Sequence, residues 1–131
     1  MKFEDFKTKE DLIRHLKENG KCRTTEQAER YIRDHLPKEA YYQDRVIKHI
    51  RALIPSAFVW KAAAGTYSRQ GIPDVCAVIN GRYYGFEIKR PFVGILSAIQ
   101  KRTIEQIREA GGQAYVVTYP EEVTRILREE M

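Results

Sequence analysis

Residues 71–90, GIPDVCAVINGRYYGFEIKR, decide the fold that this sequence predicts. Asn80-Gly81 lies between two runs rich in β-branched and aromatic residues, and this dipeptide is typical of a type I′ turn, which needs positive φ at both central positions. We therefore expect a β-hairpin that turns at these two residues. Cross-strand partners in such a hairpin sum to one number, so Asp74 should lie opposite Glu87.

The two opposed acids are the first candidates for chemistry. Side chains that face each other in an antiparallel pair have Cβ atoms roughly 4.5 to 5.5 Å apart, and like charges there are destabilising unless something offsets them. A divalent cation would do so. Because side chains alternate between the faces of a strand, Lys89 should share the face of Glu87. The apolar residues fall on the other face: Val75, Ala77, Tyr84, Phe86 and Ile88.

A purely structural interpretation of the same stretch is also open. Pro-Asp is a common entry to a strand, and Glu-Ile-Lys is the alternation expected of any half-solvated strand. A single bulge near Gly85 or Pro73 would shift the acids out of opposition. The rest of the sequence is needed to distinguish the two interpretations.

Length and composition indicate one soluble globular domain with an anionic partner. The chain has 131 residues, 43% apolar and 31% charged, which is enough for a single hydrophobic core. Its net charge of +5 favours nucleic acid, although a solvated basic surface would give the same charge. Cys22 and Cys76 lack the spacing of a zinc site or a disulfide framework. No apolar run reaches the length of a membrane span and residues 1–5 lack the layout of a signal peptide, so we expect a cytoplasmic protein.

The first 38 residues indicate a helical extension. Thr8 precedes Asp11 by three residues and Thr24 precedes Gln27 in the same way, as in helix N-caps. The pair could cover the core, meet a second subunit or touch a ligand, and the sequence does not choose among these roles.

A third helix is expected from Glu39 to about Leu53, with Val46 and Ile50 on its inward stripe. Stepping back by three and four residues brings Gln43 and then Glu39 onto the same stripe. An acid on a buried stripe calls for a partner. However, Glu39 also lies in the first turn, where the helix dipole favours a solvated carboxylate.

A strand is expected over residues 57–61, with Trp60 in the core and base stacking as its less favoured role. The polar stretch from Ala62 to Gln70 follows. It is either a candidate substrate contact or a plain connector.

Beyond the hairpin, Ser97 can cap a helix that ends at Gly111-Gly112. Gln100 lies one turn before Ile104 on the inner face of this helix, where its amide either approaches the carboxylates or bonds to the backbone. A strand over residues 113–118 and a helix that starts at Pro120 complete the chain. A strand that follows a helical crossover usually joins its sheet in parallel, so we expect an α/β fold with a mixed sheet flanked by helices.

With these motifs in order, the chain resembles the VRR-NUC (virus-type replication-repair nuclease) branch of the PD-(D/E)xK restriction-endonuclease-like superfamily. The matching stretches are Glu39-x-x-x-Gln43, Val59-Trp60-Lys61, Gly71-Ile72-Pro73-Asp74, Gly81, Glu87-Ile88-Lys89, Leu96-Ser97-x-x-Gln100 and Ala110-Gly111-Gly112. The resemblance implies a restriction-endonuclease-like αβββαβ core, with a mixed four-stranded sheet flanked by helices and an extra N-terminal helical pair. It also implies two regions, a helical extension over residues 1–38 and a nuclease domain over residues 39–131.

The resemblance further implies a site and a cofactor. The implied metal ligands are Asp74, Glu87, Glu39 and the backbone carbonyl of Ile88. The implied catalytic residues are the same three acids, Lys89 as the catalytic lysine and Gln100 as a supporting residue. Carboxylate oxygens suit Mg²⁺ or Mn²⁺, and neither a small-molecule cofactor nor a membrane is expected.

Five basic residues are plausible phosphate contacts, although each is individually the kind of charge that is usually solvated. They are Lys61, Arg69, Arg82, Arg90 and Lys101. Ile95 departs from the family pattern, because many members have a basic residue after the glycine that precedes Leu-Ser.

The implied function is a metal-dependent DNA endonuclease that hydrolyses phosphodiester bonds in Holliday junctions or other branched DNA. It would act as a homodimer in the cytoplasm of a bacterial or phage-infected cell. The alternative is a non-cleaving module that binds branched DNA, or an accessory to a replication or repair protein. Every position of the carboxylate and lysine set is occupied, which favours the nuclease.

Overall fold

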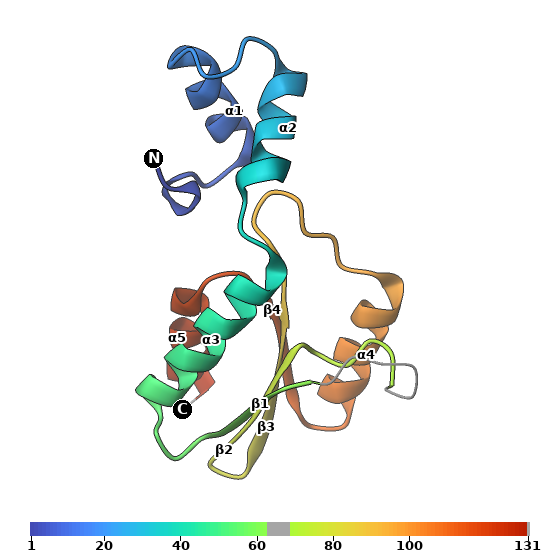
Figure 1. Cartoon of the computed structure of the whole chain (residues 1–131). Helices are drawn as coiled ribbons and strands as arrows, with labels where there is room; N and C mark the ends of the chain where they lie inside the picture. The colour runs from blue at the N-terminus through green and yellow to red at the C-terminus, as the bar shows by residue number, and fades with distance from the viewer. Residues whose placement is uncertain (63–68, 131) are drawn as a thin grey trace. The chain divides into compact units, whose positions relative to one another are not determined.

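The computed structural model of the chain describes residues 1–62 and 69–130. Its elements follow in the order η1 (Phe3–Asp5), α1 (Lys9–Glu18), α2 (Thr25–His35), α3 (Glu39–Leu53), β1 (Phe58–Lys61), β2 (Val75–Ile79), β3 (Arg82–Ile88), α4 (Ala98–Glu109), β4 (Gln113–Val117) and α5 (Pro120–Glu130) (Figure 1). Residues 63–68, the centre of the stretch expected to be a substrate contact or a connector, lie outside the described residues.

Internal contacts divide the chain into two units. The first holds Met1–Pro37 together with Pro91–Gly94, and the second holds Lys38–Arg90 together with Ile95–Met131. None of the helices in the described part of the chain is both long and apolar enough to span a membrane.

The second unit is built on a mixed sheet. Within the described residues, four strands are arranged in the order β1-β2-β3-β4. The pairs β1–β2 and β2–β3 are antiparallel, whereas β4 runs parallel to β3. The hairpin turns at Asn80 and Gly81, whose φ angles are +50° and +78°. Pairing is continuous from Ile79–Arg82 to Val75–Phe86, so the predicted turn, register and parallel fourth strand are confirmed.

The two faces of this sheet differ in what covers them. α3 and α5 pack on one face and α4 packs on the other (Figure 1). The α3–α5 face carries the hydrophobic core of the unit, which includes Val46, Ile50, Val75, Ala77, Tyr84, Phe86, Ile88, Val123 and Leu127. Alternation along the strands therefore turns Asp74 and Glu87 to the α4 face.

The prediction that Trp60 packs in the core is wrong. Val59 is the β1 residue whose side chain enters the core cluster, so alternation turns Phe58 and Trp60 to the opposite face. The rings of Phe58 and Trp60 lie 5.4 Å apart there. β1 lies at one edge of the sheet. The backbone carbonyl of Val59 accepts from Arg51 Nη2 there at 3.2 Å. In so short a strand, the sequence pattern did not reveal which set of alternate residues faces the core.

The amino-terminal unit starts both of its helices as predicted. Thr8 Oγ1 accepts from Asp11 N–H at 3.1 Å, and Thr24 Oγ1 accepts from Gln27 N–H at the same distance. These bonds satisfy N–H groups that have no partner within the helix.

The same unit has its own hydrophobic cluster, which includes Leu12, Leu16 and Ile32 and against which Phe92 and Val93 pack. Phe92 has a φ of +67°, and Val93 N–H donates to Pro91 O at 2.7 Å across it. A bulky residue rarely adopts a positive φ. Packing in this cluster therefore holds a strained turn in place.

Candidate metal centre

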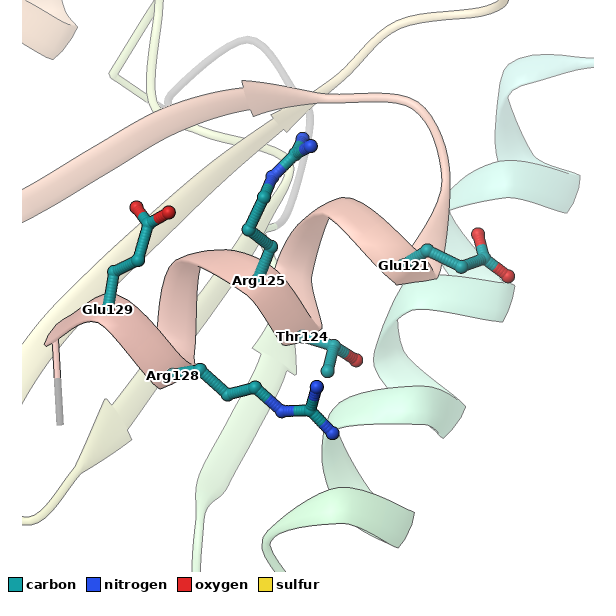
Figure 2. A pocket seen from close by; sticks show the side chains of 5 residues that line it. All are labelled: Glu121, Thr124, Arg125, Arg128 and Glu129. Carbon is teal, nitrogen blue, oxygen red and sulfur yellow. The ribbon is translucent and has the colours of Figure 1, made fainter.

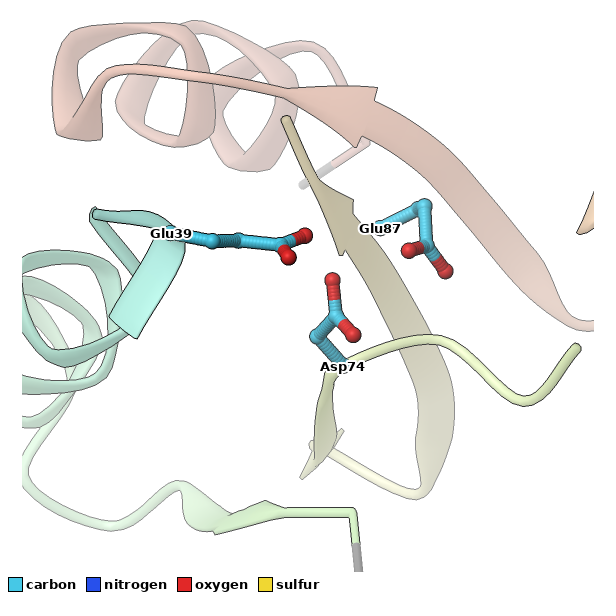
Figure 3. A group of neighbouring side chains, drawn as sticks. All are labelled: Glu39, Asp74 and Glu87. Atoms are coloured by element: carbon cyan, nitrogen blue, oxygen red, sulfur yellow. The ribbon is translucent and has the colours of Figure 1, made fainter. Parts of the chain in front are cut away.

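Three acidic side chains from three elements converge at one end of the hairpin (Figure 3). Glu39 is the first residue of α3, Asp74 directly precedes β2, and Glu87 lies near the end of β3. Each offers a carboxylate oxygen, and these oxygens all lie within 4.8 Å of one another. The fold thus brings together the three acids that the sequence singled out, and Glu39 is partly buried among them.

Asp74 is held by backbone contacts on both sides. Ala62 N–H donates to Asp74 O at 2.8 Å, which extends the pairing of β1 with β2 as far as the acid. Asp74 Oδ2 accepts from Ile88 N–H at 2.9 Å, which ties the side chain to β3. A Cβ at Gly85 would lie 2.7 Å from Pro73 Cγ. Glycine at 85 therefore allows Pro73 to lie against β3 and to lead Asp74 into the cluster.

Glu87 is buried, with 1% of its surface exposed. Its Oε1 accepts from Gln100 Nε2 at 2.8 Å and lies 3.9 Å from Lys89 Nζ. Its Oε2 is buried and has no hydrogen-bond partner among the residues that the structure describes. A buried carboxylate oxygen without a donor is costly. A cation at the cluster would satisfy it, so the donor set fits a divalent metal.

Gln100 is oriented by the start of its own helix. Ser97 N–H donates to Gln100 Oε1 at 2.9 Å, and Gln100 N–H donates to Ser97 Oγ at 3.1 Å. With its amide oxygen engaged in this capping box, the NH₂ group of Gln100 is left to face Glu87. The amide therefore bonds to the backbone and reaches the carboxylates as well. The spacing Ser-x-x-Gln at the start of a helix is a local signal that predicts this orientation.

Burial and neighbouring carboxylates raise the pKa of both glutamates. Burial is the largest cause for Glu87, and the neighbouring carboxylate of Asp74 adds to it, so its pKa rises to about 8 although Lys89 acts in the opposite direction. Burial and then the charge of Asp74 raise the pKa of Glu39, while Lys89 and Arg90 lower it. The cluster thus holds more negative charge, when its carboxyls are ionised, than the nearby cations balance.

Lys89 and Ile88 lie where the strand order places them. Lys89 N–H donates to Val117 O at 3.0 Å, and its side chain turns to the face of Glu87. The side chain of Ile88 is in the core, and its N–H bonds to Asp74. Because the N–H and C=O groups of a strand residue point to the same neighbour, the Ile88 carbonyl is directed toward the Asp74 side of β3. Its role as a ligand stays a prediction.

Lys61 and Arg69, two of the predicted phosphate contacts, each approach a side chain on a helix. Lys61 Nζ lies 3.6 Å from Asp44 Oδ1 on α3. Arg69 Nη2 donates to Gln106 Oε1 on α4 at 3.2 Å.

The other three predicted contacts differ in their distance from the acids. Arg90 follows Lys89 and acts on the pKa of Glu39, so it lies close to the cluster. Lys101 is exposed beside Gln100 on α4. Arg82 begins β3 at its other end, five residues or ~17 Å along the strand from Glu87. Contact of these residues with a phosphate stays a prediction.

A shallow hollow on α5 lies apart from the carboxylates. It is lined by Glu121, Thr124, Arg125, Arg128 and Glu129 (Figure 2). These side chains carry both signs of charge, and α5 covers the sheet face opposite to that of α4. The hollow therefore has no part in the acidic cluster.

Comparison with known proteins supports the fold. No family model matches the sequence, and no curated protein matches it. A solved structure described as a "VRR_NUC domain" is similar, with a TM-score of 0.57 and 23% sequence identity, and the match covers 69% of this chain and 94% of that chain. The expected resemblance to VRR-NUC domains and the α/β restriction-endonuclease-like architecture are thereby confirmed at the level of the fold.

Proposed function

We propose that this chain is a divalent-metal-dependent DNA endonuclease of the VRR-NUC kind. The observation that carries the proposal is the cluster of Glu39, Asp74 and Glu87, in which the buried Glu87 Oε2 has no donor within the described residues. Oxygen ligands of this kind are those that Mg²⁺ and Mn²⁺ prefer. The similarity in fold to a solved VRR_NUC domain supports the same reaction class.

The three acids would hold the ion, with the Ile88 carbonyl as a further ligand. A bound Mg²⁺ or Mn²⁺ would lower the pKa of an attacking water and offset the negative charge that builds up on the phosphate. Gln100 donates to Glu87 Oε1 and so fixes the orientation of this carboxylate. It is a positioning residue in this proposal.

Lys89 contributes a positive charge next to the acidic cluster. Its ammonium lies 3.9 Å from Glu87 Oε1, and its side chain is 17% exposed. A compact charge in this place can hold a non-bridging phosphate oxygen or orient the attacking water. Both roles stabilise charge that develops in the transition state.

DNA is the proposed substrate because the unit that carries the site is basic. Lys38–Arg90 and Ile95–Met131 contain fourteen Lys or Arg residues and ten Asp or Glu residues, and three of those acids form the cluster. A surface of this charge favours the phosphate backbone. We further propose branched DNA, such as a Holliday junction, as the preferred structure and a homodimer as the active form, because a junction requires cuts on two strands.

The experiment is cleavage of a labelled four-way junction beside matched linear duplex, single strand and flap, with Mg²⁺ or Mn²⁺. Asp74→Asn is the control, because an asparagine oxygen can still accept from Ile88 N–H while the charge is removed. We expect paired symmetric cuts in the junction that are absent from the variant.

Two results would change the assignment. Cleavage by Asp74→Asn at the normal rate would remove the proposed site. Tight binding of the junction without cleavage of any substrate would instead support the non-cleaving module that binds branched DNA.

A further inference from the structure

The sheet face that carries the acids also carries a row of apolar side chains. Trp60 pairs with Cys76 and Phe58 pairs with Val78, so the side chains of each pair lie on one face. Asp74 precedes Cys76 by two residues and lies on the same face. Trp60 is therefore the diagonal neighbour of Asp74, which directly precedes the next strand, at a distance of ~7–8 Å.

This row is open to solvent. Phe58 is 69% exposed, Trp60 37% and Val78 39%. The rings of Phe58 and Trp60 are tilted by 51° at a centroid distance of 5.4 Å. α4 packs on β4, which lies at the opposite edge of the sheet from β1. Adjacent aromatic rings that remain exposed beside a polar site are typical of a contact surface.

We propose that Trp60, with Phe58 beside it, is a stacking platform for unpaired bases of the DNA strand that enters the acidic cluster. The proposal rests on the proposed function and adds the feature of the DNA that the chain would recognise, namely unpaired bases. Every base has a face that can stack on an aromatic ring, so such a platform accepts any sequence. Bases within a duplex are already stacked, so the platform favours DNA with unpaired nucleotides next to the cleaved phosphate.

Charge favours DNA over a second copy of the chain as the occupant. The unit that carries the platform has fourteen basic and ten acidic residues, and outside the cluster the imbalance is larger, because three of the acids lie in it. A DNA strand is attracted to both the basic surface and the rings, whereas a second copy placed on this face would offer no opposite charge.

Trp60 is the only tryptophan of the chain, so its fluorescence reports on the platform directly. The Asp74→Asn chain is titrated, without metal, with a single strand, a duplex that contains an unpaired bulge, and a fully paired duplex of equal length. We expect quenching by the first two and little or none by the paired duplex. Equal quenching by all three DNAs would overturn the proposal. Binding of the single strand without any quenching would also overturn it.

Binding of labelled DNA by Trp60→Ala, followed by fluorescence anisotropy, is the second arm. Loss of one stacked base corresponds to about 5- to 150-fold weaker binding of the single strand and the bulged duplex. Trp60→Phe, which keeps a ring, should restore most of the affinity. Leu53→Ala is the matched control, because Leu53 is also an exposed apolar residue but ends α3, fourteen residues after Glu39.

Two outcomes of this arm would contradict the platform. Unchanged affinity in a folded Trp60→Ala chain is the first. The second is a wild-type dimer in sedimentation that Trp60→Ala converts to monomer with no effect on DNA affinity, which would assign the face to a second copy. Neither readout requires cleavage, so failure of the platform is distinguishable from failure of the nuclease assignment.

Discussion

Gln100 belongs both to the start of α4 and to the acidic cluster. Its amide oxygen accepts from Ser97 N–H and its NH₂ group donates to Glu87 Oε1. Gln100→Glu would keep the capping box, because a glutamate oxygen also accepts there, but it would place a carboxylate against Glu87. We expect α4 to remain folded and the rate of cleavage to fall about 10- to 100-fold.

Circular dichroism and single-turnover cleavage measure the two parts of this prediction. Gln27→Glu is the matched control, since it makes the same change on an exposed residue three residues after Thr24, the N-cap of α2. Normal cleavage by Gln100→Glu would show that the amide donor has no part in the site.

Glu87 should make the proposed metal binding depend on pH. Its pKa is raised from 4.5 to about 8, chiefly by burial. Between pH 4.5 and about pH 8, the folded chain without metal keeps a proton on Glu87 that the unfolded chain releases. The contribution of this group to the free energy of unfolding therefore falls as pH rises through this range. Metal binding requires the deprotonated carboxylate. The increase in Tm that Mg²⁺ causes should therefore grow from about pH 6 to about pH 8.

Differential scanning fluorimetry with and without Mg²⁺ across this pH range tests the point. Glu87→Gln removes the titrating group, so its Mg²⁺ response should be small and nearly constant with pH. A wild-type response that declines as pH rises would contradict the proposed coupling.

At the scale of single residues, the sequence predicted more of the site's members than of their surroundings. The opposition of Asp74 and Glu87 followed from a turn type that sets register, and register sets which side chains meet. The unpartnered Glu87 Oε2 and the raised pKa values could not be predicted, because they depend on burial by elements far apart in the sequence. The orientation of Trp60 was missed for a related reason. Both faces of a short strand can carry large apolar residues, and tertiary packing decides which face is buried.

At the scale of elements, the loop before β2 determines how closely α4 approaches the sheet. Gly71 has a φ of +82°, and a Cβ there would lie 2.6 Å from both Ile99 Cγ2 and Thr103 Oγ1. Gly71→Ala should therefore displace α4 as well as strain the backbone. We expect a loss of ~2–4 kcal/mol in the free energy of unfolding, together with weaker metal binding, since Gln100 moves with the helix.

Gly111→Ala separates the two causes. Gly111 has a φ of +92° and open space around its Cβ position, so this variant carries the backbone cost alone, ~1–2 kcal/mol. Urea unfolding of both variants gives the comparison. Equal losses would mean that the close approach of α4 to Gly71 has no energetic role.

The helices and the hairpin were predictable because each carries local signals. Thr8, Thr24 and Ser97 all cap helices as the sequence indicates, and Asn80-Gly81 forms the turn. The inclusion of Pro91–Gly94 in the amino-terminal unit was not predictable. Phe92 and Val93 resemble any apolar pair in a connector, and only the packing of the folded chain reveals that they join the α1–α2 cluster.

At the scale of the whole molecule, the chain passes between its two units next to the residues of the site. The passages fall at Pro37–Lys38, Arg90–Pro91 and Gly94–Ile95. Glu39 follows the first by one residue, Lys89 precedes the second by one residue, and Ser97 follows the third by two. The short stretches of chain beside these boundaries therefore carry Glu39, the lysine and the cap of α4.

The central claim is that the folded chain assembles a divalent-metal site from α3, β2 and β3, and direct Mn²⁺ binding tests it without any assumption about the DNA. Calorimetric titration of the full-length chain near pH 8 is the measurement, with Glu87→Gln as the test and Glu105→Gln, an exposed acid on α4, as the control. We expect saturable binding by wild type and by the control, and at least ~10-fold weaker binding by Glu87→Gln. Equal affinity in all three proteins would contradict the account.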